Sequence, residues 1–397
     1  MKKIIKAITF IIILFSLCGC YNYKEINEYA IVSGISIDKD DNDSSKYKVG
    51  IQIMNAKKDE ESQNSLITFY DASGNTIYEA LEKIMMDSPK ELYLGHNEVI
   101  VIDENLLKEK DPLNYLDFFM RDARIEKDSL VMIAKDEKAY NILKIITPLE
   151  TIPSRNLKAT LGVADNYSGA LTVVTIDEFI SVLRNDGADA ILPAVTITGK
   201  TQEGQKMENI QESDPETKLE FVTLGYFVNN KLKGYLSTND AAGYNFLANT
   251  PQRTYINVLC DDNDNYATVR VSNSSTKQSV YFKNNKPYVS EEITVEADLL
   301  EYNCKADFIE SEKYISNLEK KVSNKIKKLV TSATDKLYKE EKSDVLEYGS
   351  LFYKKKYDDM KKLSYTKKNV INDLSFKFNV DVSIRSTELS IKSVKGE

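Results

Sequence analysis

The stretch that decides the fold is EYAIVSGISIDKDDNDSSKYKVGIQI, residues 28–53. Isoleucines alternate with small or polar residues over 31–37, and apolar residues alternate again over 47–53, after the segment DKDDNDSSK. Alternation with a period of two is typical of a half-buried β-strand, and a cluster of Asp, Asn and Ser between two such runs is typical of a turn. The pattern therefore predicts a β-hairpin.

The sequence after this hairpin changes its period. Over 73–87 the apolar residues recur at helical spacing, and Pro89 ends the run. The patterns that follow predict a strand at 98–102, a helix at 113–121, a strand at 130–134 and a helix at 136–146. Strands mixed with helices in this way predict an α+β or α/β domain.

The next part of the chain is less regular. It predicts an irregular segment over 148–168, a short helix over 175–184, and a strand over 190–198 that Pro193 breaks. Residues 201–217 then hold five acids, one Lys and almost no apolar residue, which is the composition of a solvated linker. We therefore place the main boundary in this acidic linker, between an N-terminal α+β region, 20–200, and a C-terminal region, 218–397.

The C-terminal region is expected to begin β-rich, over 218–305. The predicted strands are 221–228, 254–259, 266–271, 278–282 and 293–300. Helices are expected over 310–363, because an apolar stripe at steps of three and four predicts a long amphipathic helix, and a second helical stretch follows at 346–363. Alternation over 375–385 predicts a closing strand inside a helix-covered sheet. The predicted fold class is therefore α+β and multi-domain, with mixed sheets packed by helices.

Composition limits the possible functions. The 397 residues are 42% hydrophobic and 29% charged, which is typical of a globular protein of two or three domains. One His, four Cys and no Trp leave little material for a zinc site, a His-based triad or a tryptophan-lined sugar cleft. The 61 acids exceed the 53 Lys and Arg, giving a net charge of −8, which argues against nucleic acid as the partner. We expect no enzyme activity, no cofactor and no metal site.

The N-terminus predicts where the protein resides. Lys2, Lys3 and Lys6 precede an uncharged stretch over 7–17, as in a signal peptide, here 1–19. The eleven uncharged residues of 7–17 would rise only about 16 Å as a helix, which is short for a membrane span. No other segment approaches the length of a span. We therefore expect the body of the protein to be extracytoplasmic.

The string LCGC, residues 17–20, has the form of a lipobox. Gly19 supplies the small residue before the cut, and Cys20 supplies the thiol that receives the lipid. Lipidation at Cys18 would place Leu17 before the cut, so we prefer Cys20. Two acyl chains anchor a protein stably, whereas one does so only marginally. The alternative is a plain secretory signal or an uncleaved anchor.

Few other strings in the sequence match the motif of a functional site. The string DKDDND, 38–43, lacks the Gly and the final Glu of a calcium loop, so a hairpin turn explains it better. His96 stands without a neighbouring Cys, and a structural histidine is the better interpretation. Cys260 and Cys304 could form a disulfide or remain as buried thiols.

A local excess of positive charge lies in the predicted helices. Residues 320–362 contain 13 Lys against seven acids. Four of these lysines lie on the predicted long helix: Lys320, Lys321, Lys327 and Lys328. They form either a solvated helix face or a basic surface that meets an anionic membrane or an acidic partner.

Three stretches resemble the Ger(x)C family of spore germination lipoproteins, the C subunits of nutrient germinant receptors. The first is CYNYKEINEYAIVSGISIDKD, with Cys20, Tyr21, Glu25, Ile26, Ala30, Gly34, Ile37 and Asp38 in the family pattern. The second is GHNEVIVIDENLL followed by LNYLDFFMRDARI, which carries Arg121 and Asp122. The third is LGYFVNNKLKGYLSTNDAAGYNFL, with Gly225, Phe227, Lys231, Leu232, Gly234, Leu236 and Gly243 in place.

The resemblance runs from residue 20 to about 385, with departures at three positions. Tyr21 and Phe246 stand where tryptophan is common, and Tyr357 stands near a frequent proline. The resemblance implies a three-domain α+β lipoprotein on the outer face of the spore inner membrane. It also implies that the protein acts with two integral-membrane subunits in nutrient sensing. The family brings no catalytic residue. The rival hypothesis is a lipid-anchored solute-binding protein that captures an amino acid or sugar itself.

Overall fold

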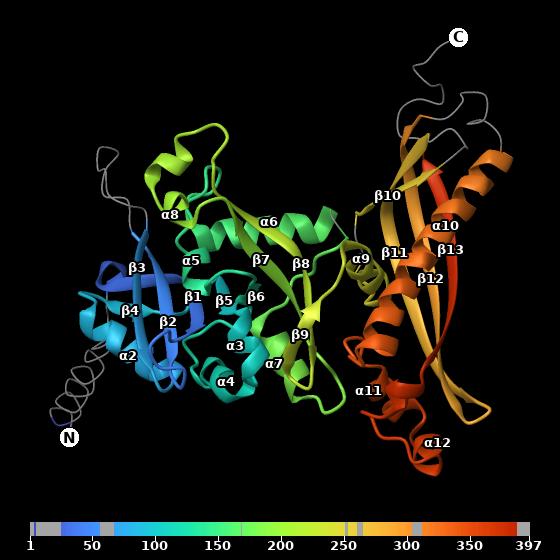
Figure 1. The fold of residues 1–397 in the computed structure, drawn as a ribbon, viewed down its shortest axis with the longest axis horizontal. Coiled ribbons are helices and arrows are strands. Elements are labelled where there is room, and N and C mark those ends of the chain that lie inside the picture. Colours follow the sequence, from blue (N-terminus) through green and yellow to red (C-terminus); the bar gives the residue numbers. More distant parts are fainter. Residues whose placement is uncertain are drawn as a thin grey trace, which may run out of the picture.

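The computed structural model describes residue 4 and residues 25–55, 67–167, 169–250, 253–259, 265–303 and 312–386. Within these ranges the chain forms one sheet of nine strands and one of four. Figure 1 shows the larger sheet and its helices on one side of the molecule, and the smaller sheet with the long helix α10 on the other. The predicted fold class, α+β with mixed sheets packed by helices, is confirmed.

The larger sheet has a parallel centre and antiparallel ends. Its strands are β1 (Tyr29–Lys39), β2 (Tyr47–Met54), β3 (Ile67–Gly74), β4 (Glu91–Tyr93), β5 (Val99–Asp103), β6 (Leu130–Ala134), β7 (Ile191–Thr198), β8 (Lys218–Val228) and β9 (Lys231–Tyr235). They follow the order β3-β2-β1-β5-β6-β7-β8-β9, and β4 pairs with β1. The antiparallel pairing of β1 with β2 confirms the predicted hairpin.

Helices cover both faces of the parallel centre. Every residue of β5 and β6 is buried, as expected for central parallel strands. The helices α2 (Ile77–Asp87), α4 (Leu113–Arg121) and α7 (Ile176–Arg184) share one core with β5, while α5 (Ala139–Ile142) and α6 (Pro153–Tyr167) share the other. The short α3 (Glu104–Glu109) follows β5. The predicted helices at 113–121 and 175–184 are confirmed, and the helix predicted over 73–87 is confirmed from Ile77, since Ser73 and Gly74 still belong to β3.

Three predictions for this half are wrong. Residues 148–168 are not irregular, because α6 occupies 153–167 and buries Leu157 and Leu161 one helical turn apart. The helix predicted over 136–146 is reduced to the four residues of α5. Pro193 does not break β7: it pairs with Leu224, and a register shift follows at the next residue, the kind of place where a strand accepts proline.

The acidic segment 201–217 packs against residues 137–146, around and after α5. It contains α8 (Thr201–Gly204) and the 3-10 helix η2 (Met207–Ile210). The buried Asn209 side chain donates to the carbonyl oxygens of Ile146 at 2.9 Å and Thr217 at 3.0 Å. Strand pairing continues beyond it into β8 and β9. The acids of segment 201–217 predict exposure, but its buried polar residues Asn209 and Thr217 hold it in place, so it is not a free linker. The chain passes to the second sheet only after β9.

The smaller sheet has the order β10-β11-β12-β13. Its strands are β10 (Tyr255–Leu259), β11 (Tyr266–Lys283), β12 (Lys286–Tyr302) and β13 (Ser375–Ser386). The strands predicted at 266–271 and 278–282 are one strand, because the polar residues between them continue the ladder with β12. Asn284 and Asn285 both have positive φ in the tight turn that joins β11 to β12. The closing strand β13 lies at an edge rather than inside the sheet, since β12 is its one partner among the described strands.

Helices pack on one face of this sheet. The long amphipathic helix is confirmed as α10 (Glu312–Thr334), which shares a core with α9 (Thr238–Leu247) and the sheet. It continues as the π-helix η4 (Asp335–Glu340), followed by α11 (Tyr348–Lys355), α12 (Tyr357–Lys362) and the 3-10 helix η5 (Val370–Asp373). The Ser323 hydroxyl donates to the Val380 carbonyl at 2.8 Å, and the Ile384 N–H donates to Glu319 at 3.0 Å. These bonds cover the free edge of β13.

Candidate functional site

The residues that the sequence singles out are divided between described and undescribed parts of the chain. Cys20, Cys260 and Cys304 lie outside the described residues. Lysines 320, 327 and 328 are exposed on α10, whereas Lys321 is half-buried and donates to the Leu259 carbonyl at 3.0 Å. The structure therefore brings these lysines together on one helix.

The described residues offer no metal cluster and no membrane span. Within them, no group of three or more His, Cys, Asp or Glu side chains could hold a metal ion. No helix among them is both long and apolar enough to cross a bilayer. His96 is 48% exposed, and its Nε2 lies 3.6 Å from Glu98.

The two sheets share a buried joint. One core cluster contains Val99 and Val101 of the first sheet together with Val280 and Val289 of the second. Such a shared core places the two halves of the chain in one packed unit. The polar part of the joint is formed by two segments, 185–189 (NDGAD) before β7 and 343–350 (SDVLEYGS) around the start of α11.

Asp189 and Asp344 connect these segments through paired backbone and side-chain bonds. The Asp189 N–H donates to the Asp344 carbonyl at 3.1 Å, and the Asp344 N–H donates to the Asp189 carboxylate at 2.8 Å. The other Asp189 oxygen accepts from the Asn229 N–H in the β8–β9 turn at 2.9 Å. Burial raises the pKa of Asp189, against these two backbone donors. The Asp189–Asp344 pair therefore holds the residues just before β7 against the residues just before α11.

Further contacts hold the two halves of the chain together at the joint. The Asn185 side chain donates to Glu347 at 2.9 Å and accepts from the Ser350 hydroxyl at 3.2 Å. The Ser343 hydroxyl donates to the Phe227 carbonyl of β8 at 2.6 Å. Gly187 has a φ of +102°, and a Cβ there would lie 2.5 Å from a side-chain atom of Lys367. The close approach of the two halves thus requires glycine at this position.

The joint extends into the second sheet through buried acids and tyrosines. Asp344 accepts from the Tyr338 hydroxyl at 2.9 Å and from the N–H groups of Tyr348 and Gly349 at 2.8 and 2.7 Å. The Tyr348 hydroxyl donates to Glu291 of β12 at 2.6 Å. A continuous chain of hydrogen bonds therefore runs from Asp189 in the first half to Glu291 in the second.

Both buried carboxyl groups on the second side have raised pKa values. Burial raises the pKa of Asp344 to about 7, although the donors Gly349, Tyr338 and Tyr348 oppose the shift. Burial also raises the pKa of Glu291 to about 7, against the single donor Tyr348. Glu291 is fully buried, and its Oε2 has no hydrogen-bond partner among the described residues. A proton on Glu291 best satisfies this environment.

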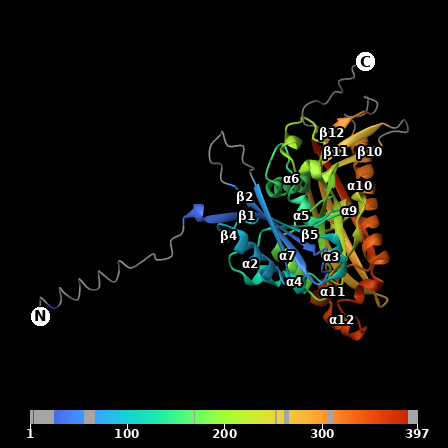
Figure 2. The same ribbon diagram turned by 60° about the vertical axis from the view of Figure 1, so that its left-hand side comes forward.

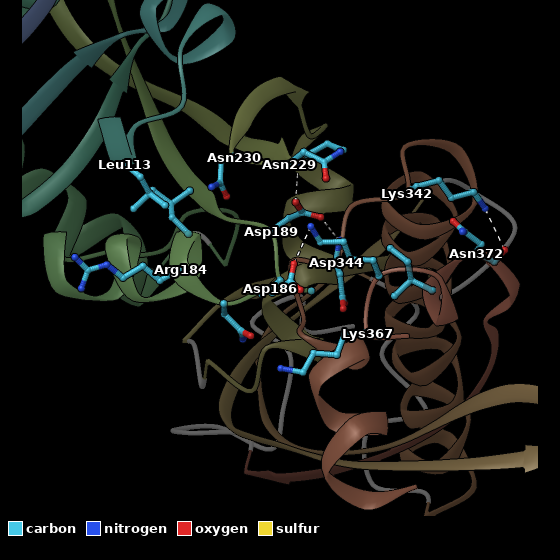
Figure 3. A pocket seen from close by; sticks show the side chains of 17 residues that line it. Leu113, Arg184, Asp186, Asp189, Asn229, Asn230, Lys342, Asp344, Lys367 and Asn372 are labelled. Atoms are coloured by element: carbon cyan, nitrogen blue, oxygen red, sulfur yellow. Dashed lines mark hydrogen bonds and ion pairs between the residues drawn. The ribbon is translucent and has the colours of Figure 1, made fainter. Parts of the chain in front are cut away.

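A cleft of about 620 Å³ lies beside the joint, shown in Figure 3. Its positive side chains include Arg184, Lys342 and Lys367. They do not converge: Arg184 points away from the central Asp189–Asp344 pair, and Lys342 points to the Asn372 carbonyl, to which it donates at 3.3 Å. The central carboxylates are already bonded to backbone donors. The arrangement is suited to holding two halves together rather than to binding a small ion or catalysing a reaction.

Sequence reasoning missed this joint. The two aspartates that exchange hydrogen bonds are 155 positions apart, and neither carries a local motif. The only local signal is the turn-forming string NDGAD, whose glycine marks a positive φ.

Comparisons with known proteins match both halves of the chain. The sequence model of the family described as "Spore germination protein N-terminal domain" matches residues 22–197. The one described as "Spore germination B3/ GerAC like, C-terminal" matches residues 223–388. Together they leave only short segments at the ends and in the middle of the chain unmatched.

Full-length relatives and a solved structure agree with these matches. The chain is 27% identical over 405 residues to spore germination protein KC of Bacillus subtilis (strain 168), covering 99% of this chain and 98% of that protein. It is 22% identical over 387 residues to spore germination protein B3 of the same organism, covering 97% and 98%. The crystal structure of the GerBC protein superimposes with a TM-score of 0.56 at 19% identity, covering 88% of this chain and 96% of that one, so the fold is shared.

Proposed function

Because this chain belongs to the Ger(x)C family of spore germination proteins, we propose that it is a lipid-anchored, non-enzymatic subunit of a nutrient germinant receptor. The observation that carries the proposal is the order of the family matches. The N-terminal match begins at residue 22, two positions after Cys20, and the C-terminal match continues to residue 388. The whole chain after the lipobox therefore has the organisation of a germination protein.

The proposed anchor is the lipidated Cys20. The first described residue of the folded body is Glu25, five positions later. Five extended residues reach roughly 18 Å, so the anchor would hold the start of β1 close to the lipid headgroups. We place the protein on the outer leaflet of the spore inner membrane, with its body extracytoplasmic.

The proposed partners are two integral-membrane subunits of the same receptor. Confinement to one membrane raises the local concentration of the partners without any new contact. The joint of Asp189 and Asp344 supports a body that moves as a unit, since it links the two sheets by reciprocal hydrogen bonds. Such a body suits assembly and signalling, with the nutrient recognised mainly in a membrane partner.

We propose the disulfide between Cys260 and Cys304 as one of two alternatives, the other being two free thiols, and the fold sets the distance that the bridge would have to span. The last described residues before these cysteines are Leu259 and Asn303. Leu259 is paired with Tyr266, and the Asn303 N–H donates to the Tyr266 carbonyl at 3.1 Å. Strands β10 and β12 flank β11, so Leu259 and Asn303 lie on opposite sides of Tyr266, about two strand spacings or roughly 10 Å apart. A disulfide requires Cα atoms about 4–7 Å apart, so the chain would have to converge beyond both residues for the bridge to form.

The rival hypothesis, a lipid-anchored solute-binding protein, has less support. A solute-binding protein commonly closes two lobes over its ligand by a hinge. Here the two halves share a core, and Arg184 and Lys342 point away from the centre of the cleft. A nutrient that bound this chain alone would raise the melting temperature of the purified protein, because it would bind only the folded state. We expect no shift with a panel of amino acids and sugars.

Deletion of the gene tests the proposed function. Spores without the protein should lose dipicolinate release in response to the receptor's nutrient and keep it in response to a receptor-independent trigger. Complementation with the wild-type gene should restore the nutrient response. An unchanged response to every nutrient tested would contradict a receptor role.

A further inference from the structure

The exposed face of α10 carries an uninterrupted positive charge. Lysines occupy positions 320, 321, 325, 327 and 328, and no acid occurs from 320 to 334. Lys320, Lys325, Lys327 and Lys328 are exposed. Within the described part of the chain, none of these four has an ion-pair partner. They define what we call the basic face of α10.

The same continuous helix shows the ordinary pattern a few residues later. In η4, Lys336 pairs with Glu340 at 3.1 Å and Glu341 at 2.9 Å, and Lys339 pairs with Asp335 at 2.6 Å. Opposite charges three or four residues apart stabilise an exposed helix, and like charges at this spacing destabilise it. The basic face departs from this rule, since Lys325 is three residues before Lys328 with no acid beside either.

The contacts that the structure describes for α10 use other side chains than these four lysines. The opposite face of α10 supplies the buried Leu318, Val322 and Ile326 to the core between this helix and the smaller sheet. The flanking Glu319 and Ser323 bond to the edge of β13. Packing and edge protection therefore come from other side chains. A solvated helix would be served as well or better by lysines alternating with glutamates.

The position of α10 indicates what this face meets. The start of β1, which the proposed lipid anchor would hold near the membrane, and α10 lie at opposite sides of the molecule in both views (Figure 1, Figure 2). The helix α10 therefore lies on the far side of the molecule from the part of the chain nearest the anchor. Exposed cations in a chain with a net charge of −8 complement an acidic surface.

We propose that the basic face of α10 docks an acidic, extracytoplasmic protein surface of a membrane subunit of the receptor. This proposal rests on the proposed function, because it takes that subunit as the partner. The four lysines would act by electrostatic steering and specificity, so the contact should weaken as ionic strength rises.

The test is a photocrosslink from the centre of the face in intact spores. Asn324 is exposed among the lysines, and a photoreactive phenylalanine analogue there should crosslink to an integral-membrane receptor subunit. Combined replacement of Lys320, Lys325, Lys327 and Lys328 by Glu should reduce that crosslink at least tenfold. The matched control replaces four exposed lysines on α11 and α12 by Glu, namely Lys354, Lys355, Lys361 and Lys362. The control should retain the crosslink, and both variants should keep the wild-type protein level.

Each other outcome overturns the proposal. A crosslink to lipid, with tighter binding of the purified protein to phosphatidylglycerol than to phosphatidylcholine vesicles, would assign the face to the membrane. No crosslink, or one that the four α10 replacements leave unchanged, would make it a solvated face. The gene deletion tests the receptor role separately. If the deletion abolishes the nutrient response but the photoreactive analogue at position 324 gives no crosslink, only the docking surface is contradicted.

Discussion

Replacement of the buried Glu291 by Gln should stabilise the protein at neutral and alkaline pH. Glu291 lies fully buried in β12 with one donor, Tyr348, and its pKa is raised from 4.5 to about 7 by burial. In the unfolded chain the group ionises at its ordinary value. Because the folded-state pKa is the higher one, the stability due to its proton is complete below about pH 4.5 and is lost as the pH rises through 7.

The magnitude follows from the size of the shift. The pKa of Glu291 rises from 4.5 in the unfolded chain to about 7 in the folded protein, and each pKa unit corresponds to about 1.36 kcal/mol. Ionisation of this one carboxyl therefore lowers the unfolding free energy of the wild type by about 3 kcal/mol at high pH. Gln keeps the shape of the protonated acid and cannot ionise. We therefore expect the variant to exceed the wild type by up to about 3 kcal/mol at pH 8 and to match it within about 1 kcal/mol at pH 4.5.

Urea unfolding of the mature chain at several pH values measures this effect. Far-UV circular dichroism and tyrosine fluorescence can follow it, since the chain has 24 Tyr and no Trp. The control is Glu292→Gln, which changes the exposed neighbour on the other face of β12 and should alter stability by less than about 0.5 kcal/mol. Equal pH dependence in Glu291→Gln and the wild type would refute the reasoning.

Two further predictions concern backbone strain and the cysteines. Gly187→Ala should lower the free energy of unfolding by about 1–3 kcal/mol, because the φ of Gly187 is +102° and the new Cβ would press on Lys367. Gly162→Ala, on the open face of α6, should raise the free energy of unfolding by about 0.5–1 kcal/mol. The urea midpoints of the two variants should therefore move in opposite directions. If Cys260 and Cys304 form a disulfide, alkylation of the unfolded protein followed by mass spectrometry should label them only after reduction. Labelling without reduction would show two free thiols.

The sequence predicts those parts of the fold in which one segment carries its own pattern. The alternation over 31–37 and 47–53 locates the β1–β2 hairpin, and the stripe on α10 locates the longest helix. In α6, by contrast, Leu157 and Leu161 are the only strong apolar pair, and Gly162 weakens the helical pattern, so the helix is missed.

The joint and the anchor mark the two limits of prediction from sequence. The bonds between Asp189 and Asp344 depend on packing between segments 155 positions apart, and no local pattern reports them. The strands β8 and β9 join the first sheet for the same reason, although an acidic segment precedes them. The lipobox is the opposite case, since its evidence is wholly in the string that ends at Cys20.

The measurement that tests the central claim most directly is nutrient-triggered dipicolinate release from spores that carry Cys20→Ala, with the levels of this protein and of its proposed membrane partners quantified. The account predicts that the nutrient response is lost while a receptor-independent trigger still works; falling partner levels would then indicate a role in assembly, and steady levels a role in signalling. A normal nutrient response at normal protein level would contradict the claim that this chain acts as a lipid-anchored receptor subunit.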